Sequence, residues 1–213
     1  RLRVPDLSRL ADAAHQAGGM LVVDNTFATH LICRPIDYGA DIVVESLSKQ
    51  VNGHSDAMLG LVAAADGEVG DRIQSTISTF GLASSPLDCF LTHRGLGTLA
   101  VRLERAGQNA LALAKHLREL PEVIAVDYPG LAEHPQHEAC TRQLRGNYGW
   151  MLSFQLATDW EGVHSLFEAL MPEIPFLTSL GDISTSVSHP ASTSHRGLPE
   201  VDRNALGITD GTV

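Results

Sequence analysis

The hydrophobic positions in the first third of the chain switch between a helical spacing and short, continuous apolar runs. Four of them recur every three or four residues ahead of the glycine pair at 18–19: Leu7, Leu10, Ala11 and Ala14. This spacing predicts a helix that the glycine pair ends. Apolar runs at 20–25, 41–46 and 57–64 predict short strands buried on both faces, as in a parallel sheet. The alternation therefore predicts an α/β layer fold.

A long helical pattern fills the middle of the chain. Leu and Ala recur every three or four residues over 96–120, which predicts a helix long enough to connect two domains. We place the boundary between them near Gly107. This division gives an α/β domain at 1–106 and a smaller domain at 107–213.

The second half of the chain has the pattern of an α+β domain. Apolar runs at 123–128 and 150–156 predict strands, and 160–170 predicts an amphipathic helix. The last residues, 206–213, resemble the beginning of a strand. Because the chain also starts without methionine, directly before a helix, we expect both ends to be truncated.

The composition is that of a globular protein with an ample core. The chain has 213 residues, a formal net charge of −10 and a mean hydropathy of +0.02. The acidic balance and the scattered Lys and Arg argue against a nucleic-acid partner. No stretch approaches the roughly 20 apolar residues of a membrane span, and no signal peptide opens the chain. The sequence thus predicts a cytoplasmic protein with no membrane partner.

The cysteines and histidines form no metal-binding pattern. Cys33, Cys89 and Cys140 include no CxxC pair and leave an odd thiol, which indicates a reducing compartment. We interpret each as a small core residue rather than a nucleophile. The nearest approach to a histidine pair is His134 and His137, whose three-residue spacing is weak as a zinc signal. We expect no metal site.

Candidate chemistry gathers around Lys49. Ser46, Ser48 and Lys49 lie within four positions at the end of the second predicted strand, and Asp24 lies at the end of the first. Functional groups of an α/β fold gather at the carboxyl ends of strands, so we expect these side chains in one site. An amine for an imine, hydroxyls for a phosphate and a carboxylate for a ring nitrogen are what pyridoxal 5'-phosphate (PLP) requires.

Each of these residues also has a simpler interpretation. A lysine after a strand is usually a solvated surface residue, and Asp24 could cap the turn that follows it. In the functional interpretation, Asp24 is a buried carboxylate paired with the protonated pyridine nitrogen, which keeps the ring cationic. The periodicity does not choose between the two roles of Asp24.

Several segments, in order along nearly the whole chain, resemble the family of cystathionine γ-lyase, cystathionine γ-synthase and methionine γ-lyase. These are PLP-dependent enzymes of cysteine and methionine metabolism. The matching segments are 22–29, 39–44, 46–49, 52–56, 94–99, 128–131, 134–138, 179–181, 189–192 and 206–211. The resemblance implies PLP-dependent transferase fold type I, with part of the large, mainly parallel-sheet domain followed by the smaller C-terminal domain. It also implies a homotetramer built from dimers.

The resemblance assigns a role to each candidate residue. Lys49 matches the Schiff-base lysine, which also moves protons at the substrate's α and β carbons. Asp24 matches the carboxylate on the pyridine nitrogen, and Ser46 and Ser48 match the two hydroxyls that hold the phosphate. Ser179 matches a residue on the substrate side of the pocket. The implied activity is a carbon–sulfur lyase or transferase that performs γ-elimination or γ-replacement on cystathionine, methionine or an O-acyl-homoserine.

The chain also departs from the family pattern. Gln50 stands where the family usually has an aromatic residue, and Glu45 adds a negative charge beside the expected phosphate site. Ser184 stands where the cystathionine enzymes have a glutamate, and Asp182 is closer to methionine γ-lyase. The preferred sulfur amino acid therefore stays open.

Family segments that complete the pocket are absent from this sequence. They include a glycine-rich phosphate loop, a ring-stacking tyrosine and the arginine that binds the substrate carboxylate. We therefore expect this chain to be a fragment that by itself binds PLP weakly and has little or no catalytic turnover. A non-catalytic relative that serves as a PLP carrier or oligomerisation module stays an alternative, and an aminotransferase of the same fold is less favoured by the motifs.

Overall fold

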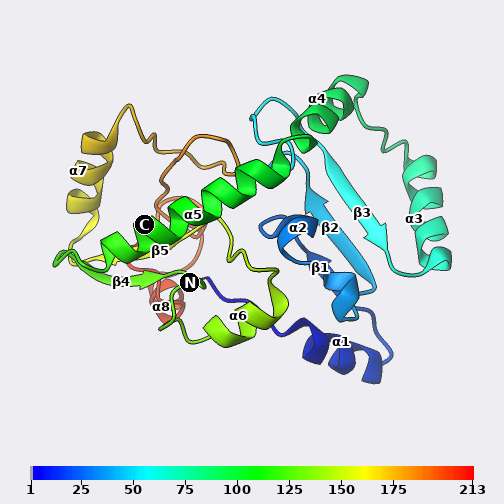
Figure 1. Cartoon of the computed structure of the whole chain (residues 1–213), viewed down its shortest axis with the longest axis horizontal. Coiled ribbons are helices and arrows are strands. Elements are labelled where there is room, and N and C mark those ends of the chain that lie inside the picture. The colour runs from blue at the N-terminus through cyan, green and yellow to red at the C-terminus, as the bar shows by residue number, and fades with distance from the viewer. Residues whose placement is uncertain (1) are drawn as a thin grey trace.

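The first half of the molecule is built around a three-stranded sheet. The computed structural model describes residues 2–213. Strands β1 (Val22–Asp24), β2 (Ile42–Ser46) and β3 (Gly60–Ala64) lie in the order β1-β2-β3, as Figure 1 shows. β1 and β2 are parallel, with Val22 opposite Ile42, and are connected by α2 (Thr29–Ile32) and the 3₁₀ helix η1 (Pro35–Tyr38). The predicted α/β arrangement is present in this half.

The third strand differs from its prediction. β3 is antiparallel to β2, and its first three residues are exposed rather than buried on both faces. The connection between β2 and β3 contains no helix that could cross over the sheet, so the chain can return only in the opposite direction. β1 is also partly exposed because it lies at an edge of the described sheet, where Val22 is 54% exposed.

The helices around this sheet begin at polar caps. α1 (Leu7–Gln16), predicted from its spacing, starts where the Asp6 carboxylate accepts the Arg9 N–H. α3 (Gly67–Phe80) was not predicted. Its cap is Asp66, and it has no buried residue among its own. Its apolar residues Val69, Ile73, Ile77 and Phe80 recur every three or four positions, which is the signal that could have found this helix.

The long helix predicted over 96–120 is present over Leu99–Leu117, and a separate helix that was not predicted precedes it. α4 (Pro86–Leu96) and α5 (Leu99–Leu117) are separated by Gly97 and Thr98. α5 runs between the two halves of the molecule (Figure 1), and the expected division at 106/107 falls inside it. That division stays a prediction.

The second half holds a two-stranded antiparallel sheet. It consists of β4 (Val123–Asp127) and β5 (Ser153–Leu156). The chain end continues this pairing, because Phe154 and Val213 exchange backbone hydrogen bonds of 2.9 Å. Three helices complete this half: α6 (His137–Gln143), α7 (Trp160–Leu170) and α8 (Glu200–Ala205). β4, β5 and α7 were predicted; α6 and α8 were not, since both are short.

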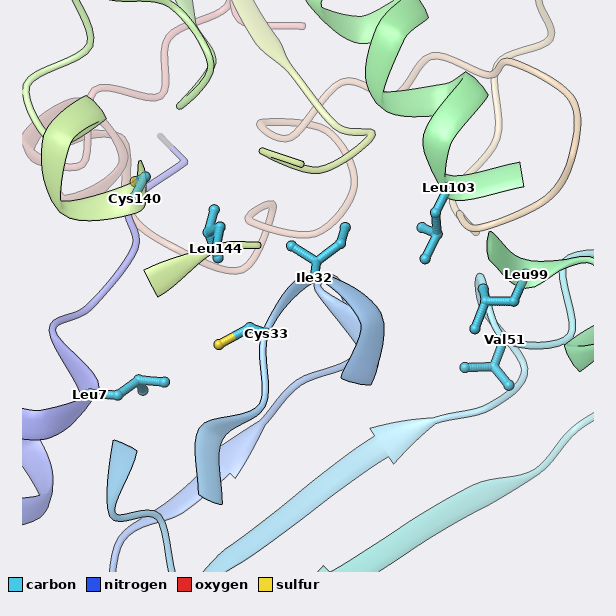
Figure 2. Close-up of a cluster of buried hydrophobic side chains, with 8 residues drawn as sticks. All are labelled: Leu7, Ile32, Cys33, Val51, Leu99, Leu103, Cys140 and Leu144. Carbon is cyan, nitrogen blue, oxygen red and sulfur yellow. The ribbon is translucent and has the colours of Figure 1, made fainter. Parts of the chain in front are cut away.

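One apolar cluster joins the two halves. Figure 2 shows its buried members: Leu7, Ile32, Cys33, Val51, Leu99, Leu103, Cys140 and Leu144. The amino-terminal segment is also tied to α6, where the Gln143 side chain accepts the Leu7 N–H at 3.2 Å. Because Val51 belongs to this cluster, the turn that follows Lys49 is anchored in the core of the protein.

The cysteines only partly follow their prediction as core residues. Cys33 and Cys140 are buried, and burial raises the pKa of the Cys33 thiol to about 11. Cys89 is exposed on α4, so the expectation that it is a core residue was wrong. Within residues 2–213, no helix is both long and apolar enough to cross a membrane.

Candidate active site

The candidate residues lie where the two parallel strands end. Asp24 is the last residue of β1 and Ser46 the last residue of β2. Strand β1 pairs with β2 in register, with Asp24 opposite Val44, so both carboxyl ends meet at one edge of the sheet. Ser48 and Lys49 follow in the turn after β2.

Lys49 meets a residue from the far end of the chain. Its half-buried side chain donates a hydrogen bond from Nζ to the Ser179 hydroxyl at 3.4 Å. Within the described residues, the Lys49 amine forms no salt bridge. The structure thus brings together the predicted lysine and the predicted substrate-side serine, which are 130 positions apart.

Asp24 is exposed, not buried as its functional interpretation required. The reason is its place at the end of an edge strand, which no other described strand covers. Its Oδ1 accepts hydrogen bonds from the Thr26 N–H at 3.0 Å and from the Thr26 hydroxyl at 2.6 Å. The capping role considered from the sequence is therefore present, and among residues 2–213 it leaves Oδ2 without a hydrogen-bond partner.

Thr26 connects the two strand ends. Besides donating to Asp24, its hydroxyl oxygen accepts the Ser46 backbone N–H at 2.8 Å. Sequence reasoning did not single out this residue. An Asp-x-Thr spacing at the end of a strand is the signal that could have found it, because such side chains bond to the backbone two residues away.

The two serines differ in their availability. Among residues 2–213, the Ser46 side-chain hydroxyl has no hydrogen-bond partner, so it can donate to an added group. The Ser48 hydroxyl accepts the Leu59 N–H at 2.9 Å and donates to the Leu59 carbonyl at 3.3 Å. To hold a phosphate, Ser48 would have to redirect the longer of these two bonds.

Glu45 lies on the other face of β2 from Ser46. It is 6% exposed and accepts a hydrogen bond from the Asn25 amide at 2.8 Å. Burial raises the pKa of the Glu45 carboxyl, and the nearby Asp24 charge adds to the rise. The departure from the family pattern at this position therefore does not place a carboxylate beside Ser46, because neighbouring strand residues point to opposite faces.

Replacing Glu45 by glutamine is expected to stabilise the protein at neutral pH. A carboxyl with a raised pKa in the folded state contributes most below its unfolded pKa of about 4.5, and stability falls as the pH rises through the folded value. Glutamine keeps the acceptor for Asn25 without this penalty. Urea unfolding between pH 4 and pH 8 tests this prediction. The free energy of unfolding of E45Q should exceed that of the wild type only at the upper end of this pH range. Lower stability at every pH would contradict it.

The segment that carries Ser179 is fitted closely against the Lys49 turn. Gly181 has a φ of +89°, and a Cβ built on it would lie 2.7 Å from the Lys49 Cα. The Ile183 N–H donates to the Gly53 carbonyl at 3.0 Å. Only a residue without a side chain permits this approach.

Asp182 adds a polar connection to the same contact. It accepts hydrogen bonds from the Ser55 hydroxyl at 2.6 Å and from the Ser184 hydroxyl at 2.7 Å. Although partial burial acts to raise it, these bonds hold the pKa of Asp182 below its usual range. Ser184, one of the departures from the family pattern, is thus engaged with Asp182 in this structure.

The two histidines of the weak zinc signal bond to oxygen atoms of the protein. His134 is 2.9 Å from the Asp127 carboxylate and 3.1 Å from the Leu2 carbonyl, and His137 is 2.9 Å from the Pro129 carbonyl. In the described part of the chain, no group of three or more His, Cys, Asp or Glu side chains could hold a metal ion.

The whole chain, residues 1–213, matches the Cys/Met metabolism PLP-dependent enzyme family. The chain belongs to this family. It is 40% identical over 209 residues to a cystathionine gamma-lyase of Dictyostelium discoideum, covering 98% of this chain and 54% of that protein. It is 38% identical over 214 residues to a cystathionine beta-lyase of Coxiella burnetii, covering 100% of this chain and 55% of that protein.

Solved structures of this PLP-dependent family share the fold. A cystathionine gamma synthase from Xanthomonas oryzae pv. oryzae, in complex with aminoacrylate and cysteine, has a TM-score of 0.93 and 39% identity. A yeast cystathionine gamma-lyase has the same TM-score and identity. Both matches cover 99% of this chain, but 54% and 55% of those chains. The family and the fold type inferred from the motifs are thus confirmed, and the chain spans about half the length of its relatives.

The residues of the strand-end site fit the family's cofactor. The Lys49 amine is held by one long hydrogen bond, the Ser46 hydroxyl is open to a new acceptor, and the Asp24 carboxylate keeps one free oxygen. An aldehyde, a phosphate and a protonated ring nitrogen are the groups that such donors and acceptors can bind. Ser48 fits less directly, because Leu59 already uses its hydroxyl.

Proposed function

We propose that this chain forms the lysine-bearing half of a PLP-dependent carbon–sulfur lyase or transferase that acts on sulfur amino acids. The observation that carries the proposal is the Lys49 amine, half-buried and outside any salt bridge in the described residues, at the strand-end edge that Asp24 and Ser46 share. The Ser179 hydroxyl, from a segment 130 positions away, lies 3.4 Å from this amine.

The proposed roles follow from the chemistry of each side chain. PLP, when bound, supplies an electron sink for the charge that develops on the substrate's α carbon. Lys49 takes the α proton and, where sulfur departs from the γ carbon, also moves a proton at the β carbon; the sulfur takes up a proton as it leaves as a thiol. Asp24 holds a proton on the ring nitrogen, Ser46 and Ser48 donate to the phosphate, and Ser179 orients the Lys49 amine.

The substrate class is a thioether or activated homoserine amino acid such as cystathionine, methionine or an O-acyl-homoserine. The named relatives include lyases that cleave at the γ or β carbon and a synthase. γ-Elimination and γ-replacement share the proton transfers at the α and β carbons that precede the departure of the leaving group, so the proposal covers both outcomes. We further propose a homo-oligomer, since the family's dimers share their sites, and a cytoplasmic location.

Reductive trapping tests the proposal on the chain itself. The sequence has only two lysines, Lys49 and Lys115, and Lys115 is exposed on α5, so it serves as an internal reference amine. After incubation with PLP, borohydride reduction and digestion, mass spectrometry should find the pyridoxyl group mainly on Lys49. Equal labelling of both lysines, or labelling of Lys115 alone, would contradict a selective site.

A further inference from the structure

Arg102, on the first turn of α5, uses every N–H of its guanidinium. Nε donates to the Thr98 hydroxyl at 3.0 Å. Nη1 donates to the Gln50 carbonyl at 2.6 Å and to the Gln50 side-chain oxygen at 3.4 Å. Nη2 donates to the carbonyls of Val51 at 3.0 Å and Gly95 at 2.9 Å. An arginine has five such donors, and all five have protein acceptors here.

Two of these acceptors directly follow Lys49 in the chain. The turn that contains Gln50 and Val51 is buried, with both residues at most 5% exposed, and it belongs to no helix or strand. Buried carbonyls outside regular structure need another donor, because a buried carbonyl without a hydrogen bond destabilises the folded state. Arg102 supplies that donor. It also explains why glutamine stands after the lysine, since Gln50 is turned toward the guanidinium.

The surrounding glycines leave room for this contact. Gly53 has a φ of +76°, and a Cβ on it would lie 2.6 Å from the Arg102 guanidinium carbon. Gly95 approaches the Asn52 backbone so closely that a Cβ would lie 2.9 Å from the Asn52 carbonyl carbon. Helix α4, helix α5 and the Lys49 turn therefore meet at one guanidinium.

We propose that Arg102 is a positioning residue for Lys49, acting through the backbone of the turn rather than by touching the lysine side chain. Gly181 closes over the same turn from the C-terminal half, so the Lys49 backbone is fixed on two sides. The planar guanidinium of an arginine can donate to two carbonyls at once in a fixed geometry, whereas the ammonium group of a lysine is a single charged centre on a flexible side chain. The inference rests on the proposed role of Lys49 as the amine that receives PLP.

The test compares R102Q with R105Q, a matched control three residues further along the same helix. Arg105 is exposed and makes no hydrogen bond or salt bridge with the described residues. We expect R102Q to lower the ratio of pyridoxyl label on Lys49 to label on Lys115 by about threefold or more, as expected from losing even one net hydrogen bond. R105Q should leave the ratio unchanged.

Hydrogen exchange separates a positioning role from a general loss of structure. In R102Q, the Asn52 and Gly53 amides, which donate to the Leu47 and Lys49 carbonyls, should exchange faster, while amides of β4 and β5 keep their wild-type rates.

If R102Q does not fold, R102K replaces it in the test. Lysine keeps the positive charge and the aliphatic side chain of arginine but lacks the planar guanidinium. Peptide mapping distinguishes a label on the new lysine from a label on Lys49. A folded Arg102 variant with the wild-type labelling ratio would overturn the inference. Absence of Lys49 selectivity in the wild type would instead overturn the proposed function.

Discussion

Replacing Lys49 by alanine is expected to abolish attachment of PLP and to lower turnover of the full-length protein by roughly 10³-fold or more. The loss is large because one amine both binds the cofactor and moves the substrate's protons. The only other lysine of this sequence, Lys115, lies on the exposed face of α5 and cannot replace it. The fold should survive, since the Lys49 side chain makes a single 3.4 Å hydrogen bond and no salt bridge among residues 2–213.

The matched control for K49A is K115A, which removes the other lysine from an exposed position. K115A should keep the reduced pyridoxyl adduct on Lys49 and should keep turnover. Both variants should unfold within about 1 kcal/mol of wild type, as expected for substitutions of partly or fully exposed side chains. Loss of the folded state together with activity in K49A would show that Lys49 is a structural residue. Ammonia and 2-oxo acid release from cystathionine by K49A would remove it from the chemistry altogether.

The local part of the site could be predicted because it depends on neighbours in the sequence. Lys49 and Ser46 lie next to the end of an apolar strand, and Asp24 ends the strand before it in the chain. A parallel pair of strands brings their carboxyl ends together by geometry alone, so the shared edge follows from the two apolar runs. The exposure of Asp24 did not follow, because a sequence pattern does not say which strand forms the edge of a sheet.

The parts that sequence reasoning missed depend on contacts between distant segments. Arg102 lies in a helix whose periodicity shows only its apolar face, and two of its backbone acceptors, Gln50 and Val51, are about 50 positions away. Ser179 was assigned from a resemblance rather than from periodicity, and the 3.4 Å contact with Lys49 appears only in the folded chain. The antiparallel direction of β3 also depends on what the connecting segment does, which apolar spacing does not encode.

Replacing Gly181 by alanine should have the second-largest effect, on both stability and the Lys49 site. Its Cβ would meet three main-chain atoms of the Lys49 turn, the Lys49 Cα at 2.7 Å and the Gln50 nitrogen and Lys49 carbonyl carbon at 2.8 Å, and none of them can rotate away. The positive φ of +89° adds a cost of about 1–2 kcal/mol for an L side chain. Together with about 1–3 kcal/mol for overpacking, we expect G181A to lower the free energy of unfolding by about 2–5 kcal/mol.

G146A separates the two contributions to this loss. Gly146 has a similar φ of +78° but open space where its Cβ would lie, so its replacement should cost only the backbone part, about 1–2 kcal/mol. Urea unfolding of both variants gives the contact energy as the difference between them. Labelling with PLP and borohydride then shows where the contact acts: G181A should lose selectivity for Lys49 over Lys115, and G146A should keep it. If G181A were no less stable than G146A and as selective, the segment that carries Ser179 would not be seated on the Lys49 turn in solution. The two halves of the chain would then not be joined at this site.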